Sequence, residues 1–249
     1  MIILKSKEEI ERMAQSCHIV AMTLEAVKAI VQPGMTTEEI DRYADDFIRK
    51  HDAIPAFKGY RGYPASICAS VNHEVIHGIP SRRELKDGDI LSIDLGVYKD
   101  GFYGDAARTF PIGKIHPEAE KLLRITEEAL CIGIEHARSD NRVSDISHAV
   151  QTYVEANGFS VVRAFVGHGI GRDLHEDPHV PNFGRPGRGP ILQPGMTLAI
   201  EPMVNEGDYD VLVLDDGWTA VTKDGKLSAH FEHTILITSE QPRILTILQ

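Results

Sequence analysis

Residues 88–110 read GDILSIDLGVYKDGFYGDAARTF, and this stretch predicts a β-hairpin. The first arm, residues 89–97, is apolar and β-prone, residues 98–101 have the composition of a tight turn, and residues 102–110 return as a second arm. Because short turns join antiparallel strands, the two arms are expected to pair with each other. The rest of the chain can be placed around this hairpin.

Each arm carries one carboxylate, Asp94 or Asp105, inside an otherwise apolar run. A two-residue turn at Lys99 and Asp100 would place the two acids opposite each other, whereas a longer turn would shift the register by a residue or two. Aspartate is depleted in strands and is almost never buried without a partner. Taken alone, the hairpin leaves two interpretations open: one Asp caps the turn and the other faces water, or both belong to a buried site.

A second stretch of the chain repeats the first arm. Gly88–Asp94 aligns without gaps on Gly195–Glu201 at an offset of 107 residues, and the helix starts at 38–40 and 144–146 match at an offset of 106. Internal similarity of this kind indicates two structurally related halves. We therefore expect a pseudo-twofold arrangement in which each half delivers a carboxylate to a shared site.

Hydrophobic periodicity predicts amphipathic helices and short strands in both halves. Ser6 with Glu9 and Thr36 with Glu39 form capping boxes at the first two helix starts. The helices are expected at residues 6–31, 36–51, 117–138 and 143–157, and further strands at 66–71, 159–166, 217–222 and 228–238. This order predicts an α+β protein of one domain, residues 1–249, with halves of about 1–112 and 113–249.

Asp224 and Gly225 predict the turn between the last two of these strands. If that turn has two residues, Phe231 lies opposite Trp218, and Glu232 is next to it. Trp218, the only tryptophan of the sequence, would then lie near the candidate site.

Composition limits the kind of protein this can be. The chain has 249 residues, of which 42% are hydrophobic, and this is enough for one large domain with a real core. A net charge of -11, from 26 basic and 37 acidic residues, argues against nucleic acid or an anionic membrane as the main partner. Cys17, Cys68 and Cys131 show no CxxC spacing, and the N-terminus has no apolar signal region. We expect a cytoplasmic protein without disulfides or membrane spans.

Four acids on apolar strands and one histidine in a glycine-rich loop form a candidate metal site. The loop reads GHGIG around His168, and its three glycines allow unusual backbone conformations. Four carboxylates within about 4 Å would repel one another by several kcal/mol per pair at an effective dielectric constant of about 20. Two divalent cations would cancel these charges, and oxygens with one imidazole suit Mn, Fe or Co, with Zn as an alternative. The expected ligands are Asp94, Asp105, His168, Glu201 and Glu232.

A rival metal motif occurs at residues 175–179, which read HEDPH and match the HExxH pattern of zinc metalloproteases. That motif requires a helix with both histidines on one face, and Pro178 would lie in its middle. We interpret the match as a coincidence and expect Glu176 to be dispensable for activity. His175 is still able to serve as a lone hydrogen-bond donor.

With these residues in view, the chain resembles type I methionine aminopeptidases, whose pita-bread fold is shared with prolidase, aminopeptidase P and creatinase. The resemblance covers essentially the whole length. It implies helices packed on a curved, mostly antiparallel sheet with pseudo-twofold symmetry. Its most specific parts are the hairpin with Asp94 and Asp105, GHGIG at 167–171, AIEPM at 199–203, HFEHT at 230–234 and NHEVIHGIP at 72–80.

The resemblance also implies an activity and a role for each site residue. The activity is removal of the initiator methionine from nascent proteins and peptides with a small second residue, by hydrolysis with two metal ions. The five expected ligands would hold the ions, with Asp105 and Glu232 shared by both, and Glu201 would also take a proton from the attacking water. His77 and His175 would contact the substrate. The methionine pocket would be lined by Tyr60, Tyr63, Cys68, Leu174 and Trp218.

Two positions depart from many relatives of this kind: Leu174 is Phe in some bacterial members, and Arg61 stands where many carry His. The expected partners are nascent N-termini at the ribosome, and the expected state is a monomer. Two alternatives remain open. One is an X-Pro peptidase of the same fold, which usually has an extra N-terminal domain, and the other is a non-catalytic pita-bread binding protein, which typically loses metal ligands.

Overall fold

The computed structural model describes residues 2–248. Within them, four α-helices match the predicted ranges to within two residues at each end. Ser6 and Thr36 cap the first two helices with complete capping boxes, in which the cap side chain and the glutamate three residues later each accept a backbone N–H. The helices are α1 (Lys7–Ile30), α2 (Thr37–Lys50), α3 (Pro117–His136) and α4 (Val143–Ala156).

The predicted hairpin is formed by β4 (Ile90–Lys99) and β5 (Phe102–Pro111). Its two-residue turn is Asp100–Gly101, and both residues have left-handed backbone, with φ of 49° and 90°. These are the conformations of a type I′ turn, which favours Asp-Gly because glycine accepts positive φ without strain. The turn therefore lies one residue later than the expected turn at Lys99 and Asp100.

This shift of the turn changes the register of the two acids. Asp94 lies opposite Ala107, and Asp105 lies opposite Gly96. Because residues two apart on a strand share one face of the sheet, both carboxylates still point to the same side. The acids are diagonal neighbours and not a directly opposed pair.

Each half builds its own antiparallel sheet around a central strand. In the first half β4 also pairs with β1 (Ile54–Pro55) and β2 (Cys68–Val71). In the second half β9 (Thr197–Ile200) takes the corresponding place, in a sheet with β7 (Gly167–Gly169), β8 (Glu176–Val180), β14 (His233–Leu236) and β15 (Arg243–Ile244).

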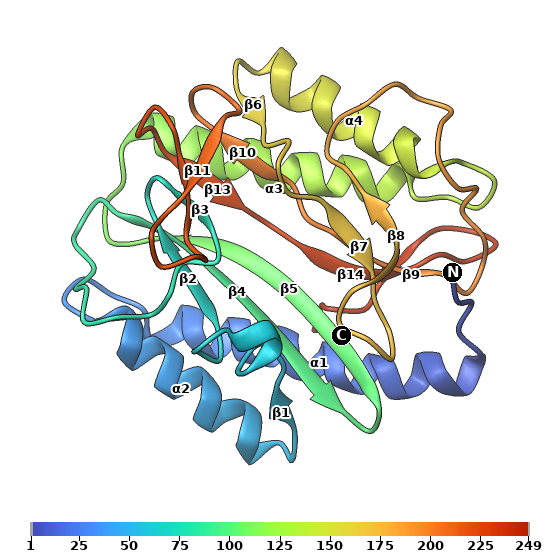
Figure 1. The fold of residues 1–249 in the computed structure, drawn as a ribbon, viewed down its shortest axis with the longest axis horizontal. Coiled ribbons are helices and arrows are strands. Elements are labelled where there is room, and N and C mark those ends of the chain that lie inside the picture. Colours follow the sequence, from blue (N-terminus) through green and yellow to red (C-terminus); the bar gives the residue numbers. More distant parts are fainter. Residues whose placement is uncertain (1, 249) are drawn as a thin grey trace.

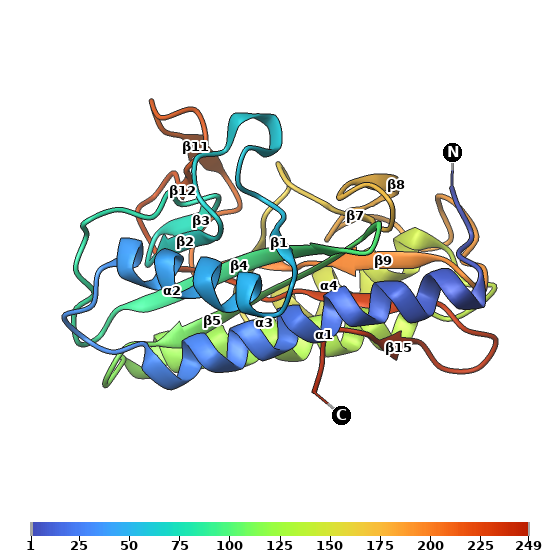
Figure 2. The same ribbon diagram turned by 90° about the horizontal axis from the view of Figure 1, so that it is seen from below.

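Short strands and a 3₁₀ turn form the remaining regular structure. They are η1 (Tyr60–Gly62), β3 (Glu74–Ile76), β6 (Ser160–Val161), β10 (Met203–Asn205), β11 (Val211–Val213), β12 (Ala220–Thr222) and β13 (Ser228–His230). In Figure 2, α1 and α3 lie beneath β4, β5 and β9, while β3, β8 and β11 rise on the opposite side. Figure 1 shows the same strands between the two helix pairs. The acid-bearing strands therefore have helices on one face and short strands with loops on the other.

Hydrogen bonds to the backbone of β5 join the two halves beside the acids. Thr234 Oγ1 donates to the carbonyl of Asp105 at 2.7 Å and accepts from the Asp105 N–H at 3.2 Å. The N–H of Glu232 donates to the carbonyl of Ala107 at 2.9 Å. Because Asp105 and Ala107 belong to β5, the second half is attached to the central hairpin of the first.

These contacts explain why one predicted strand is interrupted, and two other predicted strands form only in part. The predicted strand 228–238 divides into β13 and β14, because the Glu232 N–H between them donates to the Ala107 carbonyl on β5. Of the predicted strand 159–166, only β6 forms. The predicted range 217–222 forms β12 at its end only.

The predicted pairing of Trp218 with Phe231 is wrong. β12 pairs with β11 and β3, whereas β13 pairs with β10. The Asp224 carboxylate accepts the backbone N–H groups of Asp208 and Lys226, at 3.0 and 3.1 Å, and so ties its turn to the segment before β11.

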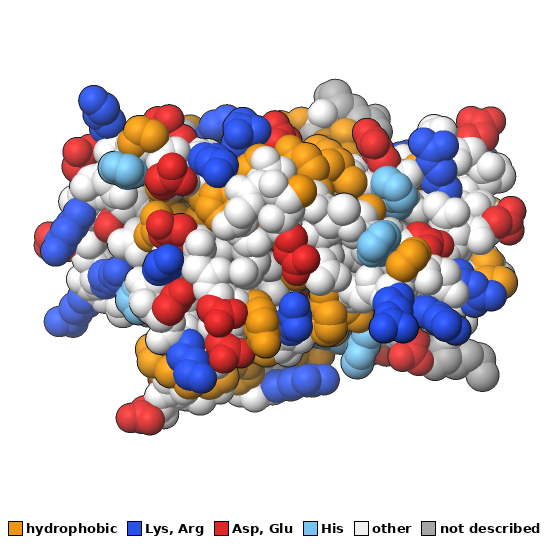
Figure 3. Space-filling model, turned by 90° about the horizontal axis from the view of Figure 1, so that it is seen from above, with side chains coloured by type: hydrophobic (Ala, Val, Ile, Leu, Met, Phe, Trp, Pro, Cys, Tyr) orange, Lys and Arg blue, Asp and Glu red, His pale blue; other side chains and the backbone are white. Residues whose placement is uncertain are grey.

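The outer surface gives two further observations. On the face in Figure 3, acidic and basic side chains are interspersed, with apolar groups between them. Within residues 2–248, no helix combines the length and the apolar character that a bilayer span needs.

Candidate metal and substrate site

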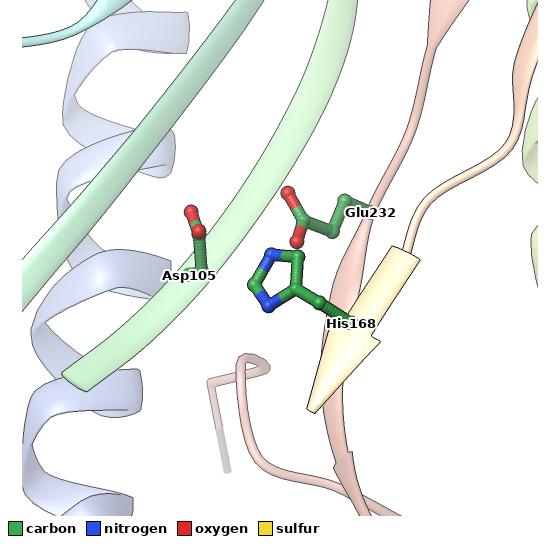
Figure 4. Close-up of side chains that lie close together, drawn as sticks. All are labelled: Asp105, His168 and Glu232. Atoms are coloured by element: carbon green, nitrogen blue, oxygen red, sulfur yellow. The ribbon is translucent and has the colours of Figure 1, made fainter. Parts of the chain in front are cut away.

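Five side chains from both halves line one cavity. Asp94 and Asp105 come from the hairpin, His168 from β7, Glu201 from the residue after β9, and Glu232 from the break between β13 and β14. One ligand atom each from Asp105, His168 and Glu232 lies within 4.8 Å of the others. Figure 4 shows these three side chains converging from three different elements. The His168 Nε2 also lies 3.6 Å from a Glu201 oxygen.

The acids of this cluster lack the partners that buried carboxylates need. Asp94 Oδ1, Asp105 Oδ1 and Glu232 Oε1 are buried and have no hydrogen-bond partner among the described residues. Burial raises the pKa of Asp94 to about 7, and burial together with the charges of Glu232 and Asp94 raises the pKa of Asp105 well above its usual range. A divalent cation would supply the missing partner, and the oxygen-rich donor set suits a hard or borderline cation. The residues present therefore fit a metal site.

His168 is prepared as a neutral ligand. Its Nδ1 lies 2.9 Å from the Gly169 carbonyl, so an Nδ1–H can donate there and leave the Nε2 lone pair facing the acids. Burial lowers the pKa of His168 to about 3, which keeps the ring neutral. A Cβ on Gly167 would lie 2.4 Å from the Ala199 carbonyl oxygen, and one on Gly169 would lie 2.2 Å from the Asp177 carbonyl oxygen. The first two glycines of GHGIG are required because β7 packs closely between β9 and β8.

His175 lies beside this cluster in a stack of rings. Its ring centroid is 4.2 Å from that of His168 and 5.3 Å from that of Tyr60. The Tyr60 hydroxyl lies 2.9 Å from His175 Nδ1, and the Arg61 guanidinium lies 5.4 Å from the Tyr60 ring centroid. Partial removal of the ring from water, and next the positive charge of Arg61, lower the pKa of His175 to about 4.

His77 approaches the cavity from a strained backbone position. Its φ is 59°, which is rare for a residue with a side chain, and burial lowers its pKa to about 4. Its ring meets the edges of Phe165 and Trp218, at centroid distances of 5.6 and 6.3 Å. The next position requires glycine, because a Cβ on Gly78 would lie 2.5 Å from the Ala69 carbonyl oxygen. The strain therefore occurs at the cavity, where functional residues commonly show it.

The other end of the cavity is mostly apolar. The Tyr63 hydroxyl donates to the carbonyls of Ile67 and Gly78, at 3.1 and 3.0 Å, so its ring contributes an apolar wall edge-on to Trp218. The cavity volume is about 130 Å³. Apolar cavities of about 150 Å³ accept a benzene-sized ligand, so this one can accept a single side chain. Its apolar walls come from Phe57, Tyr60, Tyr63, Cys68, Leu174 and Trp218.

A sequence profile for metallopeptidase family M24 matches residues 11–239 of the chain. The chain belongs to metallopeptidase family M24. Methionine aminopeptidase from Clostridium perfringens is 63% identical to this M24 chain, and all of both chains is covered. The crystal structure of methionine aminopeptidase from Thermotoga maritima superimposes with a TM-score of 0.98 at 48% identity, again over all of both chains.

Prolidase from Pyrococcus furiosus shares the fold of this M24 chain, with a TM-score of 0.82 at 22% identity. The match covers 99% of this chain but 66% of the prolidase. At this identity the likeness shows the fold alone. The X-Pro alternative is therefore not favoured over the methionine aminopeptidases, which match from end to end.

All twelve residues that the sequence singled out for this M24 site line the same cavity. Phe57 and Arg61 line it as well. The HExxH lookalike does not form a helix, because Glu176–Val180 is strand β8. Pro178 is buried in that strand, and the exposed His179 is not among the residues that line the cavity.

One residue of the M24 site had no role in the sequence analysis. His230 is 1% exposed, and its Nε2 lies 3.7 Å from a Glu201 oxygen without a hydrogen-bond partner among residues 2–248. A signal was present: His230 is two residues before Glu232 and so could share its face of a strand. That signal was weak because histidine is also an ordinary strand residue.

Proposed function

We propose that this chain removes the N-terminal methionine from nascent polypeptides through the site described above, with the residue roles given below. The chain is a metal-dependent aminopeptidase, as its family and its relatives indicate. One observation supports the site in particular: a single cavity of about 130 Å³ joins a buried acid cluster to an apolar end. An exopeptidase that removes a long apolar residue needs its catalytic groups and its side-chain pocket only one residue apart.

The proposed ligands are Asp94, Asp105, His168, Glu201 and Glu232, with Asp105 and Glu232 shared between two divalent cations. Mn, Fe or Co fit this donor set, with Zn as an alternative. When bound, the cations act as Lewis acids toward the scissile carbonyl and make a water more acidic. The buried carboxylate oxygens without partners support this proposal, because the negative charges of the acids need positive charge beside them.

The chain's own groups then move the protons. Glu201, 3.6 Å from His168 and buried, is proposed to accept a proton from the attacking water. His175 is proposed to donate to the carbonyl oxygen, because a Tyr60 hydroxyl that donates to Nδ1 leaves the ring proton on Nε2. His77 is proposed to contact the substrate next to the scissile bond.

The apolar end of the cavity is proposed to hold the methionine side chain. A flexible thioether suits walls made of aromatic and sulfur groups, and sulfur beside an aromatic ring gains about 0.3–1.5 kcal/mol. The proposed pocket residues are Tyr60, Tyr63, Cys68, Leu174 and Trp218, and Phe57 adds a further wall. The rim at His77 and Arg61 is proposed to admit only a small second residue.

The setting of the reaction is also a proposal. We propose that the chain works as a monomer in the cytoplasm, on nascent chains at the ribosome, and that residues 1–249 act as one catalytic domain. The free thiols of Cys17, Cys68 and Cys131 support a reducing compartment. The supply of ligands from both halves supports a single functional unit.

A peptide panel tests the substrate. Met-Ala-Ser, Met-Lys-Ser, Leu-Ala-Ser, formyl-Met-Ala-Ser and Ala-Pro-Ser would be incubated with enzyme loaded with Mn, Co or Fe, and released amino acids would be measured by mass spectrometry. We expect cleavage of Met-Ala-Ser, with leucine disfavoured by about 10-fold or more, because a poor fit in a pocket costs roughly 1–3 kcal/mol. The formylated peptide should be inert, because its α-amine is blocked.

Two outcomes of the panel would contradict the proposal. Efficient cleavage of Ala-Pro-Ser with Met-Ala-Ser intact would move the chain to the X-Pro peptidases. Rapid cleavage of Met-Lys-Ser would show that the rim does not select a small second residue.

A further inference from the structure

Lys5 and Glu176 form a buried ion pair outside the proposed ligand set. The Lys5 ammonium contacts the Glu176 carboxylate, and the two side chains are only 3% and 4% exposed. Buried charges are costly unless they are paired and hydrogen-bonded, so a pair of this kind needs an explanation. Glu176 is the glutamate of the HExxH lookalike and directly follows His175 in the chain.

The Glu176 carboxylate also closes the loop that precedes it. Its Oε1 accepts the N–H of Arg172 at 2.8 Å and that of Asp173 at 3.3 Å. Residues 171–176 are thereby drawn into a compact loop with the carboxylate at its centre. Leu174 and His175 lie on this loop, and both line the cavity.

Gly171 leaves the space in which the two charges meet. A Cβ at this position would lie 2.3 Å from Lys5 Cε and 2.7 Å from Glu176 Oε1. The Gly171 carbonyl also accepts the N–H of Tyr103 on β5, at 2.8 Å. The last glycine of GHGIG therefore serves the ion pair, whereas the first two serve the packing of β7.

Lys5 attaches the same loop to the start of the chain and to the second half. Its N–H donates to the Gly195 carbonyl at 2.8 Å, and its ammonium also donates to the Ile3 carbonyl at 3.3 Å. Gly195 is the start of the repeated stretch that ends at Glu201. One buried lysine therefore connects the N-terminal segment, the approach to β9 and the His175 loop.

We propose that Lys5 and Glu176 are positioning residues, which hold the loop 171–176 so that His175 faces the scissile carbonyl. This proposal rests on the proposed role of His175. It replaces the expectation that Glu176 is dispensable, since the Glu176 carboxylate contacts the buried Lys5 ammonium and accepts two backbone N–H groups. Glu176 acts here through the loop and not as a ligand or a base.

Single substitutions should leave one charge buried without its partner. In Glu176→Gln the amide oxygen can still accept the loop N–H groups, but the Lys5 ammonium loses its counter-charge. We expect kcat to fall by about 10-fold or more, because misplacement by about 1 Å can cost about 100-fold, and KM to change by less than about 3-fold. Bound metal, measured by elemental analysis, should not change.

Two further variants separate positioning from general damage. The double variant Lys5→Met, Glu176→Gln has no buried charge and keeps the loop acceptor, so kcat should return to within about 3-fold of the parent. The exposed pair Arg172 and Glu9, at 2.9 Å, links the same loop to the N-terminal region. The control Arg172→Met should change kcat by less than about 2-fold.

A double-mutant cycle with His175→Ala completes the test. If Glu176 acts through His175, Glu176→Gln should cause little further loss of kcat in the His175→Ala background. An equal loss in both backgrounds, or full kcat in Glu176→Gln, would overturn the positioning role alone. Full kcat in His175→Ala would instead overturn the proposed role of His175 and the positioning proposal with it. If Glu176→Gln fails to fold, the charge-free double variant is measured by itself, and a kcat more than about 3-fold below that of the parent overturns the proposal.

Discussion

Asp105 combines a backbone fixed by hydrogen bonds with a buried carboxylate oxygen that has no partner among the described residues. Its N–H and carbonyl are both bonded to Thr234 Oγ1, at 3.2 and 2.7 Å, so its backbone is fixed by the second half. Its Oδ1 is buried with no partner among residues 2–248. A fixed backbone that carries an unsatisfied carboxylate oxygen is what a cation ligand requires before the cation binds.

Replacing this carboxylate should remove metal and activity together. Asp105→Asn keeps the shape but removes one negative charge and one ligand oxygen from a site proposed to serve both cations. We expect a loss of bound metal by elemental analysis and a fall in kcat/KM of about 100-fold or more, since even supporting residues around a metal are worth about 10–100-fold. Asp100→Asn, at the exposed tip of the same hairpin, is the matched control and should keep both. Normal metal content with normal turnover in Asp105→Asn would refute its role as a shared ligand.

Sequence reasoning at this scale found residues whose chemistry conflicts with their surroundings. Asp94 and Asp105 stood out because they are acids in apolar strands, and His168 because three glycines surround it. The ion pair of Lys5 and Glu176 did not stand out, since Glu176 drew notice only through the HExxH match and a lysine near an N-terminus is an ordinary surface residue in sequence. Only the fold shows that the two are buried against each other, 171 positions apart.

The central hairpin shows how far local sequence determines an element. The two strands and their turn could be predicted, because alternating β-prone residues flank Asp100–Gly101. The position of the turn was uncertain by one residue, from Lys99–Asp100 to Asp100–Gly101, and this moves the partner of Asp94 by two residues, from Asp105 to Ala107. The break between β13 and β14 could not be predicted, because its cause is the bond from the Glu232 N–H to a carbonyl on β5.

Close packing of this hairpin against α1 gives a prediction for the element. A Cβ on Gly104 would lie 2.7 Å from the Cys17 backbone nitrogen and 2.9 Å from its Sγ, so Gly104→Ala must push β5 away from α1. We expect destabilisation by about 1–3 kcal/mol, the usual cost of overpacking, measured by denaturant unfolding of the metal-free protein. Loss of activity should follow, because the neighbouring Asp105 would move with the strand.

Gly101→Asn provides the control within the same hairpin. Gly101 has φ of +90°, and a Cβ at this position would have no neighbouring atom within 4 Å. Asn tolerates left-handed backbone better than most residues, so its effect on stability should be smaller than that of Gly104→Ala. Equal destabilisation by the two changes would mean that the contact with Cys17 is not what requires glycine at 104.

On the scale of the whole molecule, the site belongs to neither half alone. Two of the proposed ligands come from the half at about 1–112 and three from the half at about 113–249, at positions that the repeat makes equivalent for Asp94 and Glu201. The repeat of 107 residues was visible in the letters, and it predicted a shared site between the halves. Without metal, the same arrangement places buried carboxylates of both halves close together, where their negative charges repel.

Metal should therefore stabilise the whole fold, and more at pH 8 than at pH 5. In the metal-free protein Asp94 has a pKa raised from 3.8 to about 7, so its contribution to stability is lost as the pH rises from about 4 to 7, while the unfolded chain is already ionised. Buried His168 has a pKa lowered to about 3, so its effect on stability has the opposite sign: stability rises with pH up to about 6.5.

The stability gained from metal is the difference between loaded and metal-free protein at one pH, and the unfolded chain is common to both. This difference depends on pH because cations bind ionised carboxylates and so compete with protons. A fixed cation concentration of about 100 times the Kd at pH 8 should add about 2.7 kcal/mol at pH 8, or roughly 5–10 °C in Tm by calorimetry. The same concentration should add clearly less at pH 5, because the Kd is larger there. Asp105→Asn should lose most of this gain, and a larger gain at pH 5 than at pH 8 would exclude the buried acids as the main cation ligands.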